Sequence, residues 1–337
     1  MSNTAVPQSP KQKRYGFAVQ GGFTTAAADA SACYEVACED TEIISDVLQV
    51  EIAGSHGSRI PKEGNFEYHS RGSMPTLNIS GPAKQDELDH FLYAAVQGVS
   101  EGGTTPYAKT FTWPSTQPDF QSNAGYWLTW FERDPAASKT TKIHSAISQS
   151  MTLSIERGKP LWVNQDWIAK ALPSYVANPS GTWTISDYDV WEFEDIDRCT
   201  LNFGSGAVSF HVESFQFTLS YDVTPIGPDG SGGYTVYGLK YNPPEWKLTV
   251  VKDADFHTAL TNWSTNVPVD GRIGWGNATA GSVDADLDIV WHGKINDTVK
   301  AHDDIMKGEF SGYCLEAPGG TTAPFTIVMA NDTDRTW

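Results

Sequence analysis

The sequence lacks any apolar run that is long enough to span a membrane. A transmembrane helix needs roughly 20 consecutive apolar residues, and no apolar stretch of this 337-residue chain approaches that length. The first 16 residues, MSNTAVPQSPKQKRYG, contain no apolar segment of the kind found in secretory signals. We therefore expect no membrane partner, and we expect residues 1–15 to form a flexible arm.

Basic residues are scarce as well. The chain has 23 Lys and Arg against 41 Asp and Glu, so its formal net charge is −18. Tight binding to nucleic acid depends on basic side chains that neutralise phosphates and release counterions. A chain this acidic repels a phosphate backbone unless its few bases are clustered. We expect no specific binding of DNA.

Cysteine is rare and shows no metal-binding spacing. Cys33, Cys38, Cys199 and Cys314 form no CxxC pair, and none has a histidine at zinc-finger spacing. Free thiols in a reducing cytoplasm are the expected state, with a Cys33–Cys38 disulfide as the alternative. A metal cluster assembled in space from the scattered histidines also stays open, but we expect no cofactor.

Aromatic and turn-forming residues are abundant by contrast. The chain has 12 Trp, 13 Tyr and 15 Phe, and 30 Gly and 19 Pro separate many short apolar runs. This mixture favours a mainly β fold of sandwich or barrel type. A hairpin turn is expected at 227–233, GPDGSGG. The expected strands are 16–23, 43–52, 108–113, 126–133, 143–157, 182–198, 207–223, 234–241, 246–252, 284–291, 305–315 and 324–330.

One segment, residues 84–97, has the periodicity of an amphipathic helix. Gly98 is placed to end it, and a second short helix is expected at 253–263. Apolar residues recur at spacings of three and four and share one stripe: Leu88, Phe91, Leu92, Ala95 and Val96. A single stripe of this kind packs against one face of a sheet.

A long glycine- and polar-rich stretch, residues 53–75, precedes this helix. It exceeds the usual length of a connection in a compact domain, so we expect a long loop. Arg59, Lys62 and Arg71 make it locally basic in an acidic protein. Such a segment is either a contact arm that binds an acidic neighbour or an ordinary mobile loop.

The stretch PSYVANPSG, residues 173–181, is the expected boundary between two halves of the chain. We predict a first β domain over residues 16–175 and a second over 176–337. The second half repeats the first in outline, with strands, a short helix and more strands.

The segment SVDADLDIVW, residues 282–291, places Asp284, Asp286 and Asp288 two residues apart. A calcium loop of the EF-hand type needs Gly at its sixth position and Glu at its twelfth. Counted from Asp284, those positions hold Ile289 and Ile295. Apolar residues alternate with the three acids, which is typical of a strand with one apolar and one charged face.

An enzymatic function has one main candidate, a glycosidase. Paired carboxylates among tryptophans suit the cleavage or binding of sugars. However, carboxylates at positions i and i+2 of one strand point in the same direction rather than across a cleft. The sequence also contains no GxSxG, HExxH or phosphate-loop motif in a suitable context. A carbohydrate-binding or carbohydrate-cleaving β-sandwich therefore stays an alternative.

Four segments of the chain occur in an order that is typical of one family. They are the loop 53–75, the strand-to-helix segment PTLNISGPAKQDELDHFLYAAVQG, the strand SAISQSMTLSIERG and the closing strand PFTIVMANDTD. In this arrangement the chain resembles the tail tube (major tail) proteins of long-tailed bacteriophages. Another virion β-sandwich, from a capsid or a decoration protein, is the alternative within the same class.

The resemblance implies a structural virion protein rather than an enzyme. It implies tube-type β domains flanked by a helix, with two tandem tube-like domains or a second, decorating domain. The subunits would form rings, either trimers with pseudo-six-fold symmetry or hexamers, stacked into a tube for DNA. Tape-measure and tail terminator proteins would be its partners, in a virion tail assembled in the host cytoplasm.

The resemblance also implies roles for two sets of charged residues. Carboxylates on a lumen-facing strand would repel the phosphates of passing DNA, while bases of the long loop would contact the next ring. The expected lining residues are Asp187, Asp189, Asp284, Asp286 and Asp288. The expected inter-ring contacts are Arg59, Lys62 and Arg71.

Overall fold

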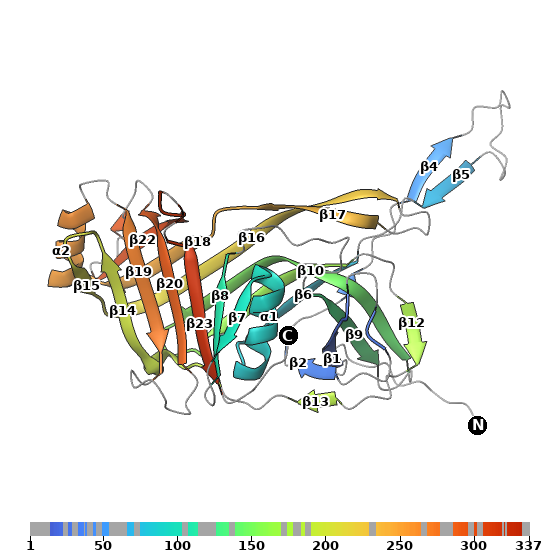
Figure 1. The fold of residues 1–337 in the computed structure, drawn as a ribbon, viewed down its shortest axis with the longest axis horizontal. Coiled ribbons are helices and arrows are strands. Elements are labelled where there is room, and N and C mark those ends of the chain that lie inside the picture. The colour runs from blue at the N-terminus through green and yellow to red at the C-terminus, as the bar shows by residue number, and fades with distance from the viewer. Residues whose placement is uncertain are drawn as a thin grey trace.

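Over its described residues the computed structural model is mainly β with two helices, which confirms the mainly β part of the predicted fold class (Figure 1). Two β layers pack face to face, and a third sheet shares a long strand with the first layer. The structure describes residues 14–22, 26–28, 33–36, 38, 43–44, 49–53, 66–70, 75–102, 107–113, 126–134, 139–169, 174–177, 183–185, 190–228, 234–263, 268–276, 286–295, 300–301, 306–318, 320 and 322–331.

The first layer is a six-stranded antiparallel sheet in the order β6–β11–β10–β16–β18–β22. The short strands β3 (Ile43–Ile44) and β21 (Lys300–Ala301) pair with β6 and β22 at its two margins. The six strands are β6 (Thr76–Pro82), β10 (Lys139–Glu156), β11 (Trp162–Ile168), β16 (Val212–Pro228), β18 (Glu245–Val251) and β22 (Lys307–Cys314).

The second layer is antiparallel and has the order β15–β14–β19–β20–β23–β8–β7. Residues 293–295 of β20 also pair with β22, so the two layers are joined at one corner. The strands are β7 (Val99–Gly102), β8 (Tyr107–Thr112), β14 (Ile196–Asn202), β15 (Ala207–Ser209), β19 (Val269–Trp275), β20 (Asp286–Ile295) and β23 (Phe325–Asn331).

The third sheet has the order β13–β2–β1–β9–β10–β12, with a parallel pairing between β13 and β2. Strand β10 passes from this sheet into the first layer through two irregularities, one between Ile143 and Ala146 and one between Ser148 and Ser150. The added strands are β1 (Arg14–Val19), β2 (Cys33–Val36), β9 (Leu128–Asp134), β12 (Ser174–Ala177) and β13 (Trp183–Ile185).

Two hairpins complete the strand arrangement. β17 (Tyr234–Tyr241) pairs with the distal part of β16, and Pro228 stands opposite Tyr234, which confirms the hairpin predicted at 227–233. β4 (Gln49–Ala53) and β5 (Phe66–Ser70) form a separate two-stranded sheet that projects from the body (Figure 1). The prediction of a loop over 53–75 was therefore wrong at residues 66–70, which form a strand.

The helix predicted at 84–97 is confirmed as α1 (Gln85–Val96). Its five stripe residues are all buried, at most 2% exposed. The helix ends at Gln97 rather than Gly98: Gln97 takes the left-handed conformation (φ 59°), and its backbone N–H donates to Tyr93 O. The Gln97 side chain also exchanges hydrogen bonds with the backbone of Tyr126, at 2.8 and 3.0 Å. A glycine usually occupies this left-handed position at the end of a helix. Here the hydrogen bonds of the Gln97 amide offset the conformational cost of the positive φ.

The second helix, predicted at 253–263, is confirmed as α2 (Ala254–Trp263). Asp253 precedes it and accepts hydrogen bonds from the backbone N–H groups of Asp255 and Phe256, both at 3.0 Å. The bond from Phe256 is the main reason that the pKa of Asp253 is lowered. This is the usual role of an Asp at a helix start.

Three predicted strands are divided in the structure. Residues 43–52 form β3 and β4, and 207–223 form β15 and the start of β16. Residues 182–198 form β13, a 3₁₀ turn at Phe193–Asp195 and the start of β14. Glu192 and Asp195 close a capping box around that turn, because their carboxylates bond local backbone N–H groups in place of a strand ladder.

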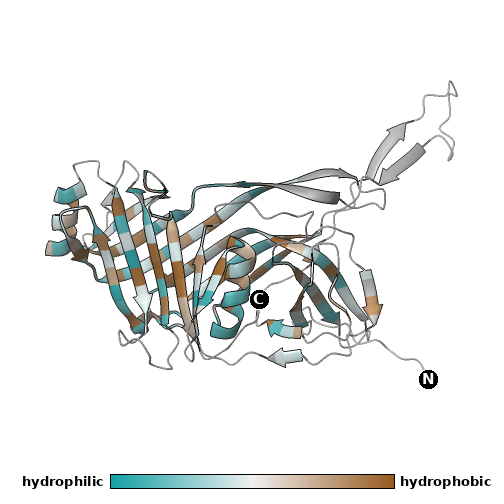
Figure 2. Ribbon diagram, viewed as in Figure 1, coloured by the Kyte–Doolittle hydropathy of each residue, from teal (hydrophilic) through white to brown (hydrophobic). Residues whose placement is uncertain are grey.

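One hydrophobic core runs through both predicted domains. Indole rings of the facing layers meet at its centre, with the Trp246 and Trp291 centroids 5.3 Å apart. Figure 2 shows the matching alternation of apolar and polar residues along the strands. The domain boundary near 175 stays a prediction, but strands from either side of it pair, β8 with β23 and β10 with β16.

We predict that Gly271→Ala destabilises the fold. A Cβ at Gly271 would lie 2.0 Å from Cε2 of Trp291, so the indole would have to move within the packed core. Overpacking of this kind costs about 1–3 kcal/mol of the free energy of unfolding. Urea unfolding followed by tryptophan fluorescence measures it.

The matched control is Gly102→Ala, where an added Cβ meets nothing within 4 Å. It should change the free energy of unfolding by no more than about 0.5 kcal/mol. Equal effects of the two substitutions would contradict the described contact between Gly271 and Trp291.

Candidate functional site

Most of the charged residues expected to be functional lie outside the described residues. These are Arg59, Lys62, Arg71, Asp187, Asp189 and Asp284. Their roles therefore stay predictions. Arg59 and Lys62 fall between β4 and β5 in the sequence, and Arg71 directly follows β5.

The two described aspartates of the predicted lining set, Asp286 and Asp288, lie on β20. Leu287 and Ile289 between and beside them are fully buried, while both aspartates are half-buried on the opposite face. The strand periodicity predicted for this segment is therefore confirmed over its described residues, 286–291.

Asp288 is paired with arginines from two neighbouring strands. Arg272 of β19 donates from Nε and Nη2 to the two carboxylate oxygens, at 3.0 and 2.7 Å. Arg198 of β14 places its Nε 3.2 Å from Asp288 Oδ1 and 3.2 Å from Asp197 Oδ1. The negative charges of the two carboxylates are cancelled by the positive charges of the two guanidinium groups. This part of the face therefore repels a polyanion only weakly.

The sequence could not reveal this pairing. Alternation along one strand gives the face of each side chain, but the partners come from strands whose register is set by the whole sheet. Gly274 lies two residues after Arg272, and a Cβ at Gly274 would collide with the side chains of both Arg198 and Asp288. The absence of a side chain at Gly274 therefore leaves space for the ion pairs of Asp288 with Arg198 and Arg272.

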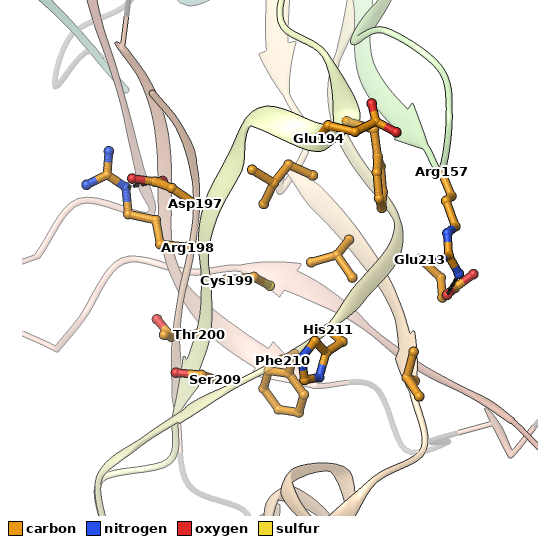
Figure 3. A pocket seen from close by; sticks show the side chains of 14 residues that line it. Arg157, Glu194, Asp197, Arg198, Cys199, Thr200, Ser209, Phe210, His211 and Glu213 are labelled. Atoms are coloured by element: carbon orange, nitrogen blue, oxygen red, sulfur yellow. Dashed lines mark hydrogen bonds and ion pairs between the residues drawn. The ribbon is translucent and has the colours of Figure 1, made fainter. Parts of the chain in front are cut away.

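A groove of about 650 Å³ lies beside β14 and the start of β16 (Figure 3). Apolar side chains such as Phe193, Ile196 and Phe210 line part of it. Charged side chains lie at its margin, where Glu213 is 3.0 Å from Arg157 and 3.2 Å from Lys307. Sequence reasoning missed this groove. Most of its lining residues come from one stretch, 193–213, but the hollow forms only where β14, β15 and the start of β16 fold back beside Arg157 and Val251.

Cys199 lines the groove but is not suited to nucleophilic chemistry. Burial raises the pKa of its thiol to about 12, so the reactive thiolate is almost absent at neutral pH. All four cysteines are free thiols, as expected, and Cys33, Cys199 and Cys314 are buried.

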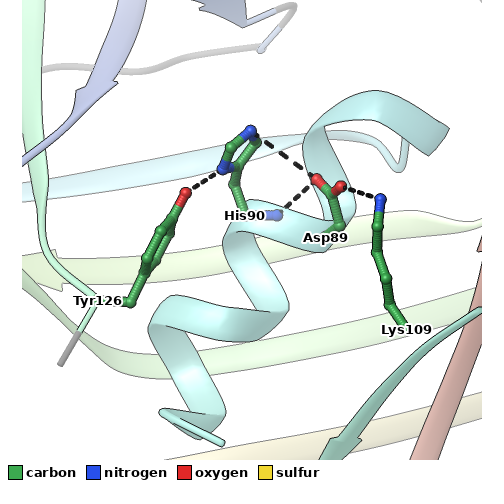
Figure 4. A network of polar contacts seen from close by, with 4 residues as sticks. All are labelled: Asp89, His90, Lys109 and Tyr126. Atoms are coloured by element: carbon green, nitrogen blue, oxygen red, sulfur yellow. Dashed lines mark hydrogen bonds and ion pairs between the residues drawn. The ribbon is translucent and has the colours of Figure 1, made fainter. Parts of the chain in front are cut away.

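A polar network lies beneath helix α1 (Figure 4). Asp89 Oδ2 is 2.9 Å from Nζ of Lys109 on β8, and both side chains are 0% exposed. The backbone N–H of His90 donates to Asp89 Oδ1 at 2.7 Å, and the His90 Nδ1 atom is hydrogen-bonded to the Tyr126 hydroxyl. His90 and Tyr126 are at most 5% exposed. These groups have the chemistry of a proton relay, but their burial keeps dissolved substrates away from them. Their role is therefore structural, because the pair of Asp89 and Lys109 fixes α1 to β8.

The described part of the chain offers no metal site and no helical membrane span. No group of three or more His, Cys, Asp or Glu side chains in it is placed to hold a metal ion. Neither α1 nor α2 is long and apolar enough to cross a membrane.

Comparison with models of known protein families gives no match, and comparison with curated protein sequences gives none. A functional proposal for this chain therefore rests on its own residues and their arrangement.

We predict that Cys199 is unreactive in the native protein. The raised pKa leaves a very small thiolate fraction at pH 8, whereas an ordinary thiol, with a pKa of about 8.5, is substantially ionised there. Treatment with iodoacetamide at pH 8, followed by peptide mass mapping, should modify the half-buried Cys38 first. Cys199 should react only after denaturation; rapid native modification of Cys199 would contradict its burial.

We predict that the Asp89–Lys109 pair shows the signature of a buried ion pair. Asp89→Asn or Lys109→Met alone leaves one charge buried without its partner, which costs about 3–5 kcal/mol of the free energy of unfolding. The double variant Asp89→Asn, Lys109→Met removes both charges, so its free energy of unfolding should fall by less than that of either single variant. Urea unfolding of the four proteins measures this, and additive losses would show that the two side chains do not interact.

Proposed function

We propose that this chain is a structural virion protein, a subunit of a phage tail tube that assembles into stacked rings through which DNA passes. The observation that carries the proposal is the β4–β5 hairpin, which projects from the body as a separate two-stranded sheet (Figure 1). An isolated two-stranded hairpin is marginally stable in water. A projecting hairpin therefore gains most of its stability by packing on another molecule, and a neighbouring copy in the next ring supplies that surface.

The order of elements supports two tube-like units in one chain. A hairpin, a strand and a helix follow one another as β4–β5, β6 and α1, and again as β16–β17, β18 and α2. Two residues separate strand from helix both times, between Pro82 and Gln85 and between Val251 and Ala254. On this basis a ring of three copies presents six units, and a hexameric ring is the alternative.

The tryptophans favour this structural role over the carbohydrate alternative. Sugar subsites need exposed aromatic rings, but seven of the twelve tryptophans are buried: Trp127, Trp130, Trp167, Trp191, Trp246, Trp275 and Trp291. Their side chains fill the interior between the sheets, where aromatic residues contribute most to stability. Another virion β-sandwich protein is less well supported, because nothing in that alternative requires the projecting hairpin.

The remaining parts of the proposal follow from tube assembly. The protein acts without a cofactor and without catalysis, in a virion tail assembled in the host cytoplasm. Its partners are copies of itself, the tape-measure protein inside the tube and the terminator at its end. Double-stranded DNA passes through without specific binding.

We predict that the purified protein forms rings and stacked tubes and that the β4–β5 hairpin is required for stacking. Negative-stain imaging of the wild type at increasing concentration should show tubes. A variant in which a short Gly-Ser linker replaces residues 49–70 should form at most single rings, because it lacks the projecting contact.

The variant must first be shown to be folded by the same urea midpoint and tryptophan fluorescence as the wild type. Tubes formed by the folded variant would refute the role of the hairpin. A wild-type protein that stays monomeric at every concentration would refute the proposed function itself.

A further inference from the structure

The ion pair beneath α1 joins an aspartate of the helix to a lysine on the apolar side of a strand. Lys109 and Phe111 of β8 are both 0% exposed, while Thr110 between them is half-buried, so Lys109 points into the core. Asp89 is 0% exposed as well, and its Oδ2 atom lies 2.9 Å from Lys109 Nζ (Figure 4). Neither charged group therefore reaches solvent.

Two ions in such a place are less stable than the neutral group they could form. Each ion loses its hydration on burial, and the attraction between the two often fails to repay that loss. An amide carries no charge, so its burial costs far less once it is hydrogen-bonded. Loss of one water molecule would convert the ammonium and the carboxylate into an amide. The core therefore favours the amide, whereas solvent favours the separate ions.

The geometry of the pair suits this condensation. Lys109 Nζ is in contact with one oxygen of the carboxylate, and groups held together in a packed core react far faster than the same groups in solution. The backbone N–H of His90 donates to the other oxygen, Asp89 Oδ1, at 2.7 Å. A donor at this position stabilises the negative charge that develops on the oxygen when an amine adds to the carboxyl carbon.

Groups that can carry protons lie beside the pair. The His90 ring has its Nε2 atom 4.0 Å from Asp89 Oδ1, and its Nδ1 atom is hydrogen-bonded to the Tyr126 hydroxyl. Glu101 is half-buried and stands directly opposite Lys109 in the pairing of β7 with β8. Side chains of directly opposed residues lie on the same face of a sheet. Both a ring nitrogen and a carboxylate are thus available for general acid–base catalysis.

We propose that Lys109 and Asp89 become joined by an intramolecular amide (isopeptide) bond, which the folded chain forms by itself. The Lys109 ammonium gives one proton to Asp89 Oδ2, and the neutral amine adds to Cγ, which leaves the negative charge on Oδ1. Nζ then gives up a second proton, which Oδ2 takes as it leaves as water. One C–N bond forms and one C–O bond breaks, and nothing is oxidised or reduced.

The bond fixes α1 to β8 covalently. It closes a loop between residues that are 20 positions apart in the chain, and such a loop restricts the unfolded chain as a disulfide does. All four cysteines are free thiols, so the amide supplies a cross-link that no disulfide provides. The order predicted above for the Lys109→Met and double variants is unchanged. Neither variant has the amine, and the charge left on Asp89 still separates them.

Mass spectrometry of the denatured wild-type protein tests the inference. Most of the protein should have a mass that is one water below the mass calculated from its sequence. Digestion after Lys, Arg and Glu should leave the fragments 88–101 and 102–132 joined, because Glu101 lies between the two linked residues and a linked Lys109 is not cleaved. Fragmentation of this product should place the link between Asp89 and Lys109.

Two controls accompany this measurement. Lys109→Arg keeps a positive charge at the position but has no amine, so it should have the full calculated mass. The pair of Lys247 and Glu309 is a control within the wild type, because its N–O distance is 3.0 Å while Lys247 is 49% exposed. Since solvent stabilises these ions, no product should join them. If Lys109→Arg does not fold, the fragments of the wild type decide alone.

Two outcomes would overturn the inference. One is a wild-type protein of full calculated mass in which the fragments 88–101 and 102–109 are separate. The other is the loss of one water in both the wild type and Lys109→Arg, because that water then comes from another part of the chain. Bond formation requires only the folded subunit, so neither outcome bears on tube formation, which negative-stain imaging tests separately.

Discussion

The antiparallel pairing of β10 with β16 is the interaction on which the rest of the structure depends. Residues Ser150–Glu156 pair with Ser214–Ser220, and this pairing joins three strands of the first half of the chain to three of the second. The resulting sheet is wide enough to cover a core that neither half encloses alone. Because the partners are distant in sequence, a large loop-closure entropy opposes the pairing, and the buried tryptophans and phenylalanines between the layers offset it.

A continuous sheet also fits the proposed role of this molecule as a subunit of an assembly. Its inner face is apolar and closed by the second layer, while its outer face carries exposed polar residues such as Asn164, Gln216 and Glu245. Projecting hairpins and edge strands invite the addition of another chain. In our account that addition is directed, because closed rings pair the edges of neighbouring copies and the projecting hairpin contacts the next ring. In the proposed role, the function would follow from the surfaces that copies of the chain present to one another.

Local patterns were predicted well from the sequence, and non-local partners were not. The stripe of α1 and the alternation in β20 are set by backbone periodicity, so Leu88, Phe91, Leu287 and Ile289 lie where the pattern places them. The range of α1 was predicted, but the left-handed residue that ends it was not: Gln97 takes this position in place of Gly98, because its amide bonds the backbone of Tyr126, 29 residues away. Strand β5 was not predicted, because it has only five residues and lies within a glycine- and polar-rich stretch. The neutralisation of Asp288 depends on the register of β14, β19 and β20, which no single segment encodes.

A symmetric electron cryomicroscopy reconstruction of the assembled tube tests the central claim most directly. Our account predicts stacked rings in which β10 and β16 of each subunit stay paired in one sheet and the β4–β5 hairpin of one ring contacts the next ring. A reconstruction in which the hairpin makes no contact between rings, or in which β10 and β16 separate into unconnected domains, would contradict it.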